Sequence, residues 1–209
     1  MTNIYKTSSK SSRNSSDNSV WIYIANNDFF NSTKELPEDR IKLCAEEYAS
    51  NFGITGKFDS ILRTDKGKPY FEEAPDLHFS ISHSGDYWVS AFSLLPIGVD
   101  VQKIRACNIA QISKRFFHIA EYKVLQNIAT ISGEEACHDA FFKIWTAKES
   151  YVKLTGTGIG GAFKSFYAAN QEIIVGNSSA ASFKFIPFDP DYKLCVCSKN
   201  IKDINCIKL

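Results

Sequence analysis

The strongest constraint on the fold is a helical pattern that covers about residues 137–155. At roughly 100° per residue, its apolar side chains fall on one side of the helix; they are Phe141, Ile144, Trp145, Tyr151 and Val152. A helix with such a stripe has to pack against another layer, and the sequence GTGIGG at 156–161 ends it. Lys148 projects from the middle of the stripe, where a core-facing helix has no structural use for a lysine.

Two interpretations of this lysine are open. In one, Lys148 extends its stem past apolar neighbours, while Glu149 and Lys153 form a solvated ion pair worth roughly 0.2–0.5 kcal/mol. In the other, these charged side chains face a phosphate-bearing ligand and its metal ion. The rest of the sequence has to decide between them.

The remaining patterns alternate between helical and strand periods. Strands are expected at 20–26, in two runs around a Ser-Gly-Asp turn within 77–95, and at 96–104. Helices are expected at 36–52, 109–117 and 120–129, and 63–76 is a loop with at most a brief strand. The segment 164–199 has the pattern of three strands joined by turns. Because both halves contain a helix followed by strands, we expect an α+β protein of two similar lobes.

These patterns divide the chain into three parts. Residues 1–19 are rich in Ser, Asn and Lys and are expected to form a flexible tail. An N-terminal lobe covers 20–98 and a C-terminal lobe covers 99–209. With 209 residues, 44% of them hydrophobic, the chain can bury one large core or two small, tightly joined ones.

Charge and composition exclude several partners. A net charge of +1 gives no reason to expect nucleic acid or a membrane surface as a partner. The opening residues lack the apolar region of a signal peptide, and no later run reaches transmembrane length. We therefore expect a cytoplasmic protein whose six cysteines are reduced and mostly buried.

The sequence GVDVQ at 98–102 places two polar side chains on one face of a strand. With a period of two, Asp100 and Gln102 point to one side, and Val99 and Val101 to the other. Alone, this pattern also suits an aspartate at a strand end near a turn. If Asp100 on the strand and Glu149 on the helix meet across a cleft, they offer the one or two protein carboxylates that Mg²⁺ usually takes beside phosphate and water.

Two further polar segments fit a phosphate-bearing ligand. In SISHSG, Ser82 and His83 come at the end of a strand, before a turn whose amides can face an anion. The sequence KGKP at 66–69 is a charged loop. Each segment taken alone is equally compatible with a polar turn at the surface.

Five of these segments occur in a fixed order: KGKPYF, HFSISHSGDYWVSAFS, PIGVDVQKI, RFFHIAEY and FFKIWTAKESYVKLTGTGI. Together, over about residues 63–160, they resemble the Sfp-type 4'-phosphopantetheinyl transferases. The motifs of that family include Gly-Lys-Pro, Ser-His-Ser, Gly-(Ile/Val)-Asp-x-Glu and Trp-x-x-Lys-Glu-(Ser/Ala)-x-x-Lys. The resemblance implies a pseudo-dimer of two similar α+β lobes, with the active site in the cleft between them.

The same resemblance implies an activity. A monomeric enzyme would transfer the phosphopantetheine arm of coenzyme A to a serine of an acyl or peptidyl carrier protein, releasing adenosine 3',5'-bisphosphate. It would use Mg²⁺, with Mn²⁺ as a second possible metal. The carrier would serve fatty acid, polyketide or nonribosomal peptide synthesis, and the sequence does not choose among these pathways.

Residue roles follow from the matching positions. Asp100 and Glu149 would hold the metal, and Glu149 would also be the base for the carrier serine. Lys153, His83 and Ser82 would lie at the phosphates. The coenzyme A contacts would further include Arg40, near the 3'-phosphate, and Lys66, Gly67, Lys68 and Pro69, beside the adenine nucleotide. Lys148 would also face the ligand, or else close the cleft structurally.

One position departs from the family pattern. Gln102 stands where the usual motif has a second acid, so a neutral amide would take the place of a metal-ligating carboxylate. An amide oxygen can still coordinate Mg²⁺, directly or through water. The alternative to an enzyme is a non-catalytic protein that binds coenzyme A or a carrier protein through the same cleft.

Overall fold

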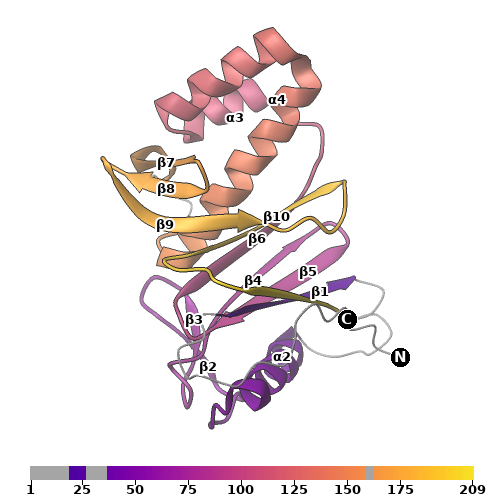
Figure 1. Ribbon diagram of the computed structural model, residues 1–209, viewed down its shortest axis with the longest axis vertical. Helices are drawn as coiled ribbons and strands as arrows, with labels where there is room; N and C mark the ends of the chain where they lie inside the picture. The colour runs from indigo at the N-terminus through magenta and orange to yellow at the C-terminus, as the bar shows by residue number, and fades with distance from the viewer. Residues whose placement is uncertain (1–18, 27–36, 159–161) are drawn as a thin grey trace.

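The computed structural model describes residues 19–26, 37–158 and 162–209. Its first sheet has the strand order β11-β1-β5-β4, formed by β1 (Val20–Asn26), β4 (His78–Ser84), β5 (Tyr87–Ser93) and β11 (Ile204–Lys208). Helix α2 (Pro37–Phe52) covers one face of this sheet (Figure 1). The expected tail at 1–19 falls almost wholly outside the described residues.

The second sheet has the order β6-β10-β9-β8-β7. Its strands are β6 (Ile97–Lys103), β7 (Phe166–Ala169), β8 (Glu172–Val175), β9 (Ser178–Phe185) and β10 (Tyr192–Ser198). A short hairpin, β2 (Ile61–Arg63) with β3 (Pro69–Phe71), flanks the first sheet, and the 3₁₀ turn η1 (Ala162–Ser165) precedes β7. The expectation of three strands in 164–199 is wrong: there are four, because Asn170 and Gln171, both at positive φ, make a tight turn between β7 and β8.

Helix α4 (Ile119–Thr155) covers the second sheet, and the short helix α3 (Ile109–Phe116) before it packs against α4 (Figure 1). Helix α4 is broken only at Gly133, whose φ of 87° and ψ of 178° are not helical. Gly156, at φ 71°, ends the helix in the left-handed conformation that glycine adopts without strain. The predicted strands at 20–26, 77–95 and 96–104 and the predicted helices are confirmed.

The packing produces four layers, seen from bottom to top in Figure 1 as α2, the first sheet, the second sheet and α4. Alternate residues of β1, β5, β6 and β10 meet in an apolar core between the sheets, including Ile22, Val89, Val99 and Leu194. The α+β class is confirmed. That the two halves are related as a pseudo-dimer stays a prediction.

The C-terminal strand crosses the expected lobe boundary. Strand β11 pairs in parallel with β1, with Val20 opposite Ile204 and Ile24 opposite Lys208. The first sheet therefore contains strands from both ends of the described chain. The division between 98 and 99 falls inside β6, close to the passage from the first sheet to the second, and it does not account for β11, so the division into lobes stays a prediction.

Side chains, not a backbone ladder, connect the facing edges of the two sheets. Every second residue of β4 is a serine whose hydroxyl accepts a β6 amide: Ser80 from Val99 (3.0 Å), Ser82 from Val101 (3.1 Å) and Ser84 from Lys103 (2.9 Å). We call these three residues the serine ladder. Because it fixes β4 beside β6, it also fixes Ser82 beside Asp100.

All six cysteines are free thiols, and four of them are buried, as the sequence predicts. Within the described ranges, no helix combines the length and apolarity that a membrane crossing requires.

Candidate functional site

The site begins where α4 lies directly on β6. A Cβ atom at Gly98 would collide with the carbonyl oxygen of Ser150 and the amide nitrogen of Leu154. Glycine is therefore the residue that lets the strand and the last turns of the helix approach this closely. The approach brings the helix side chains of Glu149 and Lys153 to the strand side chain of Asp100.

Three side chains from three elements form a closed hydrogen-bond triangle. Lys153 Nζ on α4 donates to Asp100 Oδ1 on β6 (2.7 Å) and to Ser82 Oγ on β4 (2.7 Å). Ser82 Oγ donates to the same Asp100 oxygen (2.8 Å). The structure thus brings together residues far apart in the sequence, as the cleft hypothesis required.

The other oxygen of Asp100 has no such partner. Asp100 is buried, and no described group forms a hydrogen bond with its Oδ2. Burial raises the pKa of Asp100, while Lys153 and Ser82 oppose that rise. A buried carboxylate oxygen without a partner is costly unless something else binds it.

Glu149 is a second carboxylate whose charged form is disfavoured in the folded protein. It is also buried, and its pKa is raised to about 7, first by burial and then by the negative charge of Asp100, with Lys153 opposing both. Like charges held close in a poorly hydrated site keep one of them protonated unless a cation joins them. The donor set of two carboxylates, one with a free oxygen, fits a divalent cation with oxygen ligands.

Gln102 shares the strand face of Asp100 and is half-buried. Its register partner on β10 is Lys193, whose Nζ binds Asp139 Oδ1 on α4 at 2.6 Å. Within the part of the chain that the structure describes, no three His, Cys, Asp or Glu side chains form a group able to hold a metal ion. A metal role for Gln102 therefore stays a prediction.

A cavity of about 290 Å³ opens beside the triangle. It is lined by the loop before β3, by β4 and by the end of α4. The β2–β3 hairpin contributes Arg63, Lys66, Gly67, Lys68 and Pro69, which line the cavity together with Ser80, Glu149 and Lys153. The KGKP segment therefore borders the same space as Glu149 and Lys153, and Arg63 is a lining cation that the sequence patterns did not single out.

The head of Lys68 points to protein. Its Nζ donates to the carbonyl oxygens of Leu154 (2.6 Å) and Ile97 (3.2 Å), at the end of α4 and the start of β6. Burial lowers its pKa to about 8. Lys68 thus joins the loop to α4 and β6, and any contact with a ligand is additional to that role.

Among the expected coenzyme A contacts, Ser82 reaches the cavity only through its bond to Lys153, and Lys148, His83 and Arg40 lie apart from it. His83 is exposed near the end of β4 and alternates with Ser82 and Ser84, so it points to the opposite side of the strand. Arg40 is half-buried on α2, beneath the first sheet. Neither residue lines the 290 Å³ cavity, so their roles stay predictions.

Lys148 has its hydrogen-bond partners within the protein. It is fully buried, and its Nζ donates to Glu121 Oε2 (2.8 Å) and to the carbonyl oxygen of Phe166 (2.6 Å), with the Phe166 ring 4.1 Å away. This environment favours the structural alternative for Lys148, and a contact with the cofactor stays a prediction. Through these two hydrogen bonds Lys148 joins the later part of α4 to Glu121 at the start of α4 and to Phe166 on β7.

Glu121, which no motif had singled out, is the partner that the sequence did not reveal. Its Oε2 also accepts the amide of His118 (3.0 Å), and its Oε1 accepts the amide of Ala168 (2.8 Å). His118 and Glu121 form a capping box at the start of α4. The spacing His-x-x-Glu before an apolar run was the available signal, since a glutamate at the third helical position commonly caps the helix.

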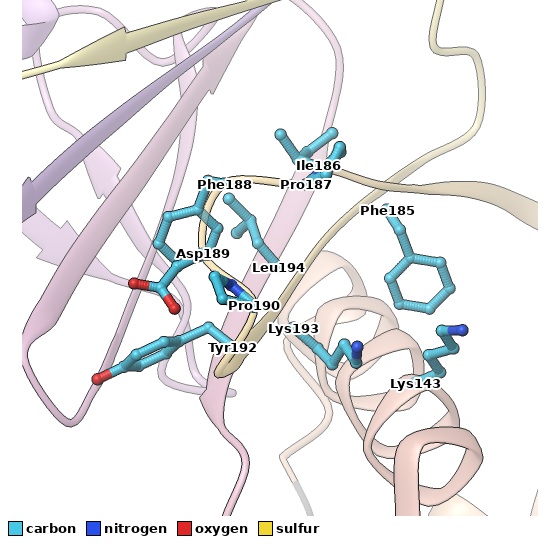
Figure 2. A pocket seen from close by; sticks show the side chains of 10 residues that line it. All are labelled: Lys143, Phe185, Ile186, Pro187, Phe188, Asp189, Pro190, Tyr192, Lys193 and Leu194. Carbon is cyan, nitrogen blue, oxygen red and sulfur yellow. The ribbon is translucent and has the colours of Figure 1, made fainter. Parts of the chain in front are cut away.

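A second cavity, of about 640 Å³, lies between the loop at 186–191 and the side of α4 (Figure 2). Its walls are mostly apolar, with Lys143 and Lys193 on the α4 side. It contains none of the residues predicted for the site. The chemistry therefore points to the smaller cavity, where buried carboxylates and lysines converge.

The fold and site define an α+β protein with paired carboxylates and a lysine in a cleft beside the junction of two sheets. Residues 96–205 match the family model of the 4'-phosphopantetheinyl transferase superfamily. This chain belongs to that superfamily. The matched range includes Asp100, Glu149 and Lys153.

Named relatives agree with this membership. The chain is 33% identical over 139 residues to 4'-phosphopantetheinyl transferase psf-1 of Bacillus pumilus, covering 64% of this chain and 58% of the relative. It is 35% identical over 138 residues to 4'-phosphopantetheinyl transferase Sfp of Bacillus subtilis, covering 63% and 59%. Another Bacillus subtilis 4'-phosphopantetheinyl transferase is 36% identical over 156 residues, covering 72% and 67%. The chain thus spans about three fifths of the length of the first two relatives.

Proposed function

We propose that this protein transfers the 4'-phosphopantetheine group of coenzyme A to a serine hydroxyl of an apo acyl or peptidyl carrier protein, releasing adenosine 3',5'-bisphosphate. The observation that carries the proposal is that Glu149 and Lys153 line one cavity while Lys153 also binds Asp100 and Ser82, in a chain that belongs to the transferase superfamily. We further propose that the protein is a cytoplasmic monomer and that its carrier serves fatty acid, polyketide or nonribosomal peptide synthesis.

Asp100 and Glu149 are the residues that would hold Mg²⁺, and Mn²⁺ would be accepted by the same oxygens. The bound metal would supply charge neutralisation at the diphosphate of coenzyme A. The support within this chain is the Asp100 oxygen without a partner and the raised pKa of Glu149. Gln102 would contribute an amide oxygen from the same strand face.

Glu149 is also the proposed general base. A base works best when its pKa lies near the working pH, and in the metal-free site burial and the charge of Asp100 raise the pKa of Glu149 to about 7; bound Mg²⁺ would lower it. It would accept the proton of the carrier serine as that oxygen attacks the phosphorus atom of the diphosphate. The proton leaves the hydroxyl, the new bond forms at the phosphopantetheine phosphorus, and the bond to the adenosine bisphosphate oxygen breaks.

Lys153 would stabilise the leaving phosphate. Its side chain is 29% exposed and lines the cavity, so a phosphate there would reach its ammonium group, which Asp100 and Ser82 already hold. Positioning and charge neutralisation supply most of the catalysis in phosphoryl transfer. Lys153 therefore binds and orients, while Glu149 handles the proton.

The departure at Gln102 favours a second candidate, a protein that binds coenzyme A or a carrier without transferring the group. One experiment separates the two. Apo acyl and peptidyl carriers are incubated with the full chain, coenzyme A and Mg²⁺, and their masses are measured. We expect a gain of the phosphopantetheine mass that requires both coenzyme A and metal; coenzyme A binding without any adduct across the carriers would establish the non-catalytic candidate.

A further inference from the structure

The turn between β4 and β5 is held by side chains of the second sheet. The amide of Asp86 donates to Tyr192 Oη (3.0 Å), and the same hydroxyl donates to Asp86 Oδ2 (3.0 Å). Lys103 Nζ donates to that carboxylate oxygen at 2.8 Å. We call Asp86, Lys103 and Tyr192 the turn clamp. One tyrosine hydroxyl therefore holds both the backbone and the side chain of a turn residue from another sheet.

The clamp residues lie so close to Gly85 that a side chain at this position of the turn would collide with them. Gly85 has a φ of 56°, which favours glycine at the first position of a two-residue turn. A Cβ atom there would also collide with the hydroxyl of Tyr192 and with the side chain of Lys103. The conformation and the contact thus both require glycine.

Tyr192 is itself fixed on the side away from α4. Figure 2 shows the Tyr192 and Asp189 side chains pointing away from the helix, opposite Lys143 and Lys193. The Tyr192 ring meets the Tyr87 ring edge-on at 4.9 Å and lies 5.8 Å from the Phe188 ring. This ring packing restrains the Tyr192 side chain. The Tyr87 hydroxyl lies outside the clamp and donates to Asp189 Oδ2 at 3.0 Å.

The clamp lies at the open end of the serine ladder. Ser84 accepts the amide of Lys103, so the last rung and the clamp share that lysine. His83, the predicted phosphate contact, comes directly before Ser84, and Gln102 comes directly before Lys103. Single serine hydroxyls, and not a backbone ladder, link β4 to β6 here. The turn clamp adds further hydrogen bonds at the end of this contact.

We propose that the turn clamp positions the end of β4 against β6, so that Asp86, Lys103 and Tyr192 act on coenzyme A through Ser82, which binds Asp100 and Lys153, and not by contact. The inference rests on the proposed function and deepens it. Displacing a binding group by about 1 Å can cost on the order of 10²-fold in rate. A clamp that fixes the turn from the opposite sheet prevents such displacement.

The test uses Tyr192→Phe in the full chain, with Tyr87→Phe as the matched control. Tyr192→Phe removes one hydroxyl and leaves the ring packing in place, and the freed Asp86 groups face water. We expect the KM for coenzyme A to rise about three- to tenfold, the range that losing one or two net hydrogen bonds allows, with little change in kcat or melting temperature. Tyr87→Phe, which loses a hydroxyl bonded to Asp189 instead, should leave the KM unchanged.

A second variant moves the turn without removing any clamp side chain. Gly85→Ala forces the turn away from Tyr192 and Lys103, so its KM should rise at least as much as that of Tyr192→Phe. Normal KM values in both variants would overturn the proposal, as would equal effects of Tyr192→Phe and Tyr87→Phe.

Hydrogen exchange keeps this inference separate from the proposed function. The Asp86 amide should exchange faster in Tyr192→Phe than in the wild type or in Tyr87→Phe. If the wild type modifies no carrier, the proposed function fails, and coenzyme A affinity by calorimetry then replaces KM as the readout. Faster exchange with unchanged affinity would show that the clamp is only structural and would overturn the positioning role.

Discussion

Lys148 and Lys153 of helix α4 each pair with a carboxylate inside the protein, yet the two pairs differ in how completely they are satisfied. Lys148 and Glu121 are both almost completely buried, and both oxygens of Glu121 accept hydrogen bonds. Lys153 and Asp100 leave Asp100 Oδ2 without a partner among the described residues, keep 29% of the lysine exposed, and have Glu149 as a second carboxylate beside them. The saturated pair has both carboxylate oxygens bound within the protein, whereas the unsaturated pair has one available to a ligand.

The difference follows from what surrounds each pair. Burial lowers the pKa of Lys148 and raises the pKa of Glu121, and their mutual attraction opposes both shifts. Backbone amides and a carbonyl group complete that network, as a buried ion pair requires. At Asp100 the pKa also rises through burial, but the second oxygen and the second carboxylate remain available to a cation.

The largest expected effect comes from a substitution that breaks the Lys148–Glu121 pair. Lys148→Met should lower the free energy of unfolding by about 3–5 kcal/mol, because Glu121 is left buried without its cation. Urea unfolding at pH 7 measures the loss. The double variant Lys148→Met with Glu121→Gln should recover much of it, since no buried charge remains. If Lys148→Met instead kept its stability and lost only turnover, Lys148 would have a ligand role after all.

Next in size is Asp100→Ala, which breaks the unsaturated pair. Transfer to a carrier should fall on the order of 10²–10³-fold, because charge stabilisation at the reacting phosphate is lost. The melting temperature should not fall, since the deleted carboxylate has an oxygen without a partner. Asp139→Ala is the control: it removes a half-buried aspartate of α4 that pairs with Lys143 and Lys193 and does not line the 290 Å³ cavity, so it should retain turnover. A folded Asp100→Ala protein with normal turnover would exclude Asp100 from the site.

The third prediction concerns pH. Since the folded-state pKa of Glu149 is about 7 and its ordinary value is 4.5, the folded state binds more protons between these values. Metal-free stability should therefore decline as pH rises from about 4.5 to 7, by up to about 3 kcal/mol, and remain low above 7. Glu149→Gln should remove this decline when unfolding is measured from pH 4.5 to 8.

Added metal provides the control for that experiment. Mg²⁺ at pH 8 should restore stability to the wild type, because binding to the folded state shifts the unfolding equilibrium. It should stabilise Glu149→Gln much less. Parallel stability curves for the two proteins between pH 4.5 and 8 would mean that Glu149 titrates near its ordinary pKa.

The smallest expected effect comes from Gln102, and it tests whether this side chain adds to the metal affinity of the site at Asp100. Gln102→Glu should lower the Mg²⁺ concentration at half-maximal activity by roughly fivefold, equivalent to about 1 kcal/mol of added attraction in a hydrated site. Turnover at saturating metal should change little. Gln126→Glu, at an exposed position of α4, is the matched control. Identical Mg²⁺ and Mn²⁺ midpoints for wild type and Gln102→Glu would place this side chain beyond the reach of the metal.

Sequence patterns predicted the local structure well because those patterns are short in range. The period of two in 77–104 marks three strands, and the period of 3.6 in 137–155 marks the helix that carries Glu149 and Lys153. The same patterns misjudged the segment 166–198, where β7 and β8 are each only four residues long. They also missed β11, whose place depends on pairing with β1 at the other end of the described chain.

For the site, the sequence supplied the candidates but not their contacts. Asp100, Glu149, Lys153 and Ser82 were all identified, and the structure places them together. Lys148 was assigned to the ligand because its partner, Glu121, lies 27 positions away in the chain, and the carbonyl of Phe166 lies 18 positions away in the other direction. No periodicity within one helix can show that such groups meet.

The sequence by itself determined the alternation of strands and helices, the order of the five motifs and the type of charged groups available, because each depends on neighbouring residues. Only the tertiary structure decided which charged group has all its hydrogen-bond partners and which still has an oxygen available to a ligand. Hydrogen-bond partners from other elements complete Glu121 and Lys148, and the close approach at Gly98 brings Asp100 to Glu149. The energy of a buried charge depends on every partner within a few ångströms, and those partners come together only when the layers pack.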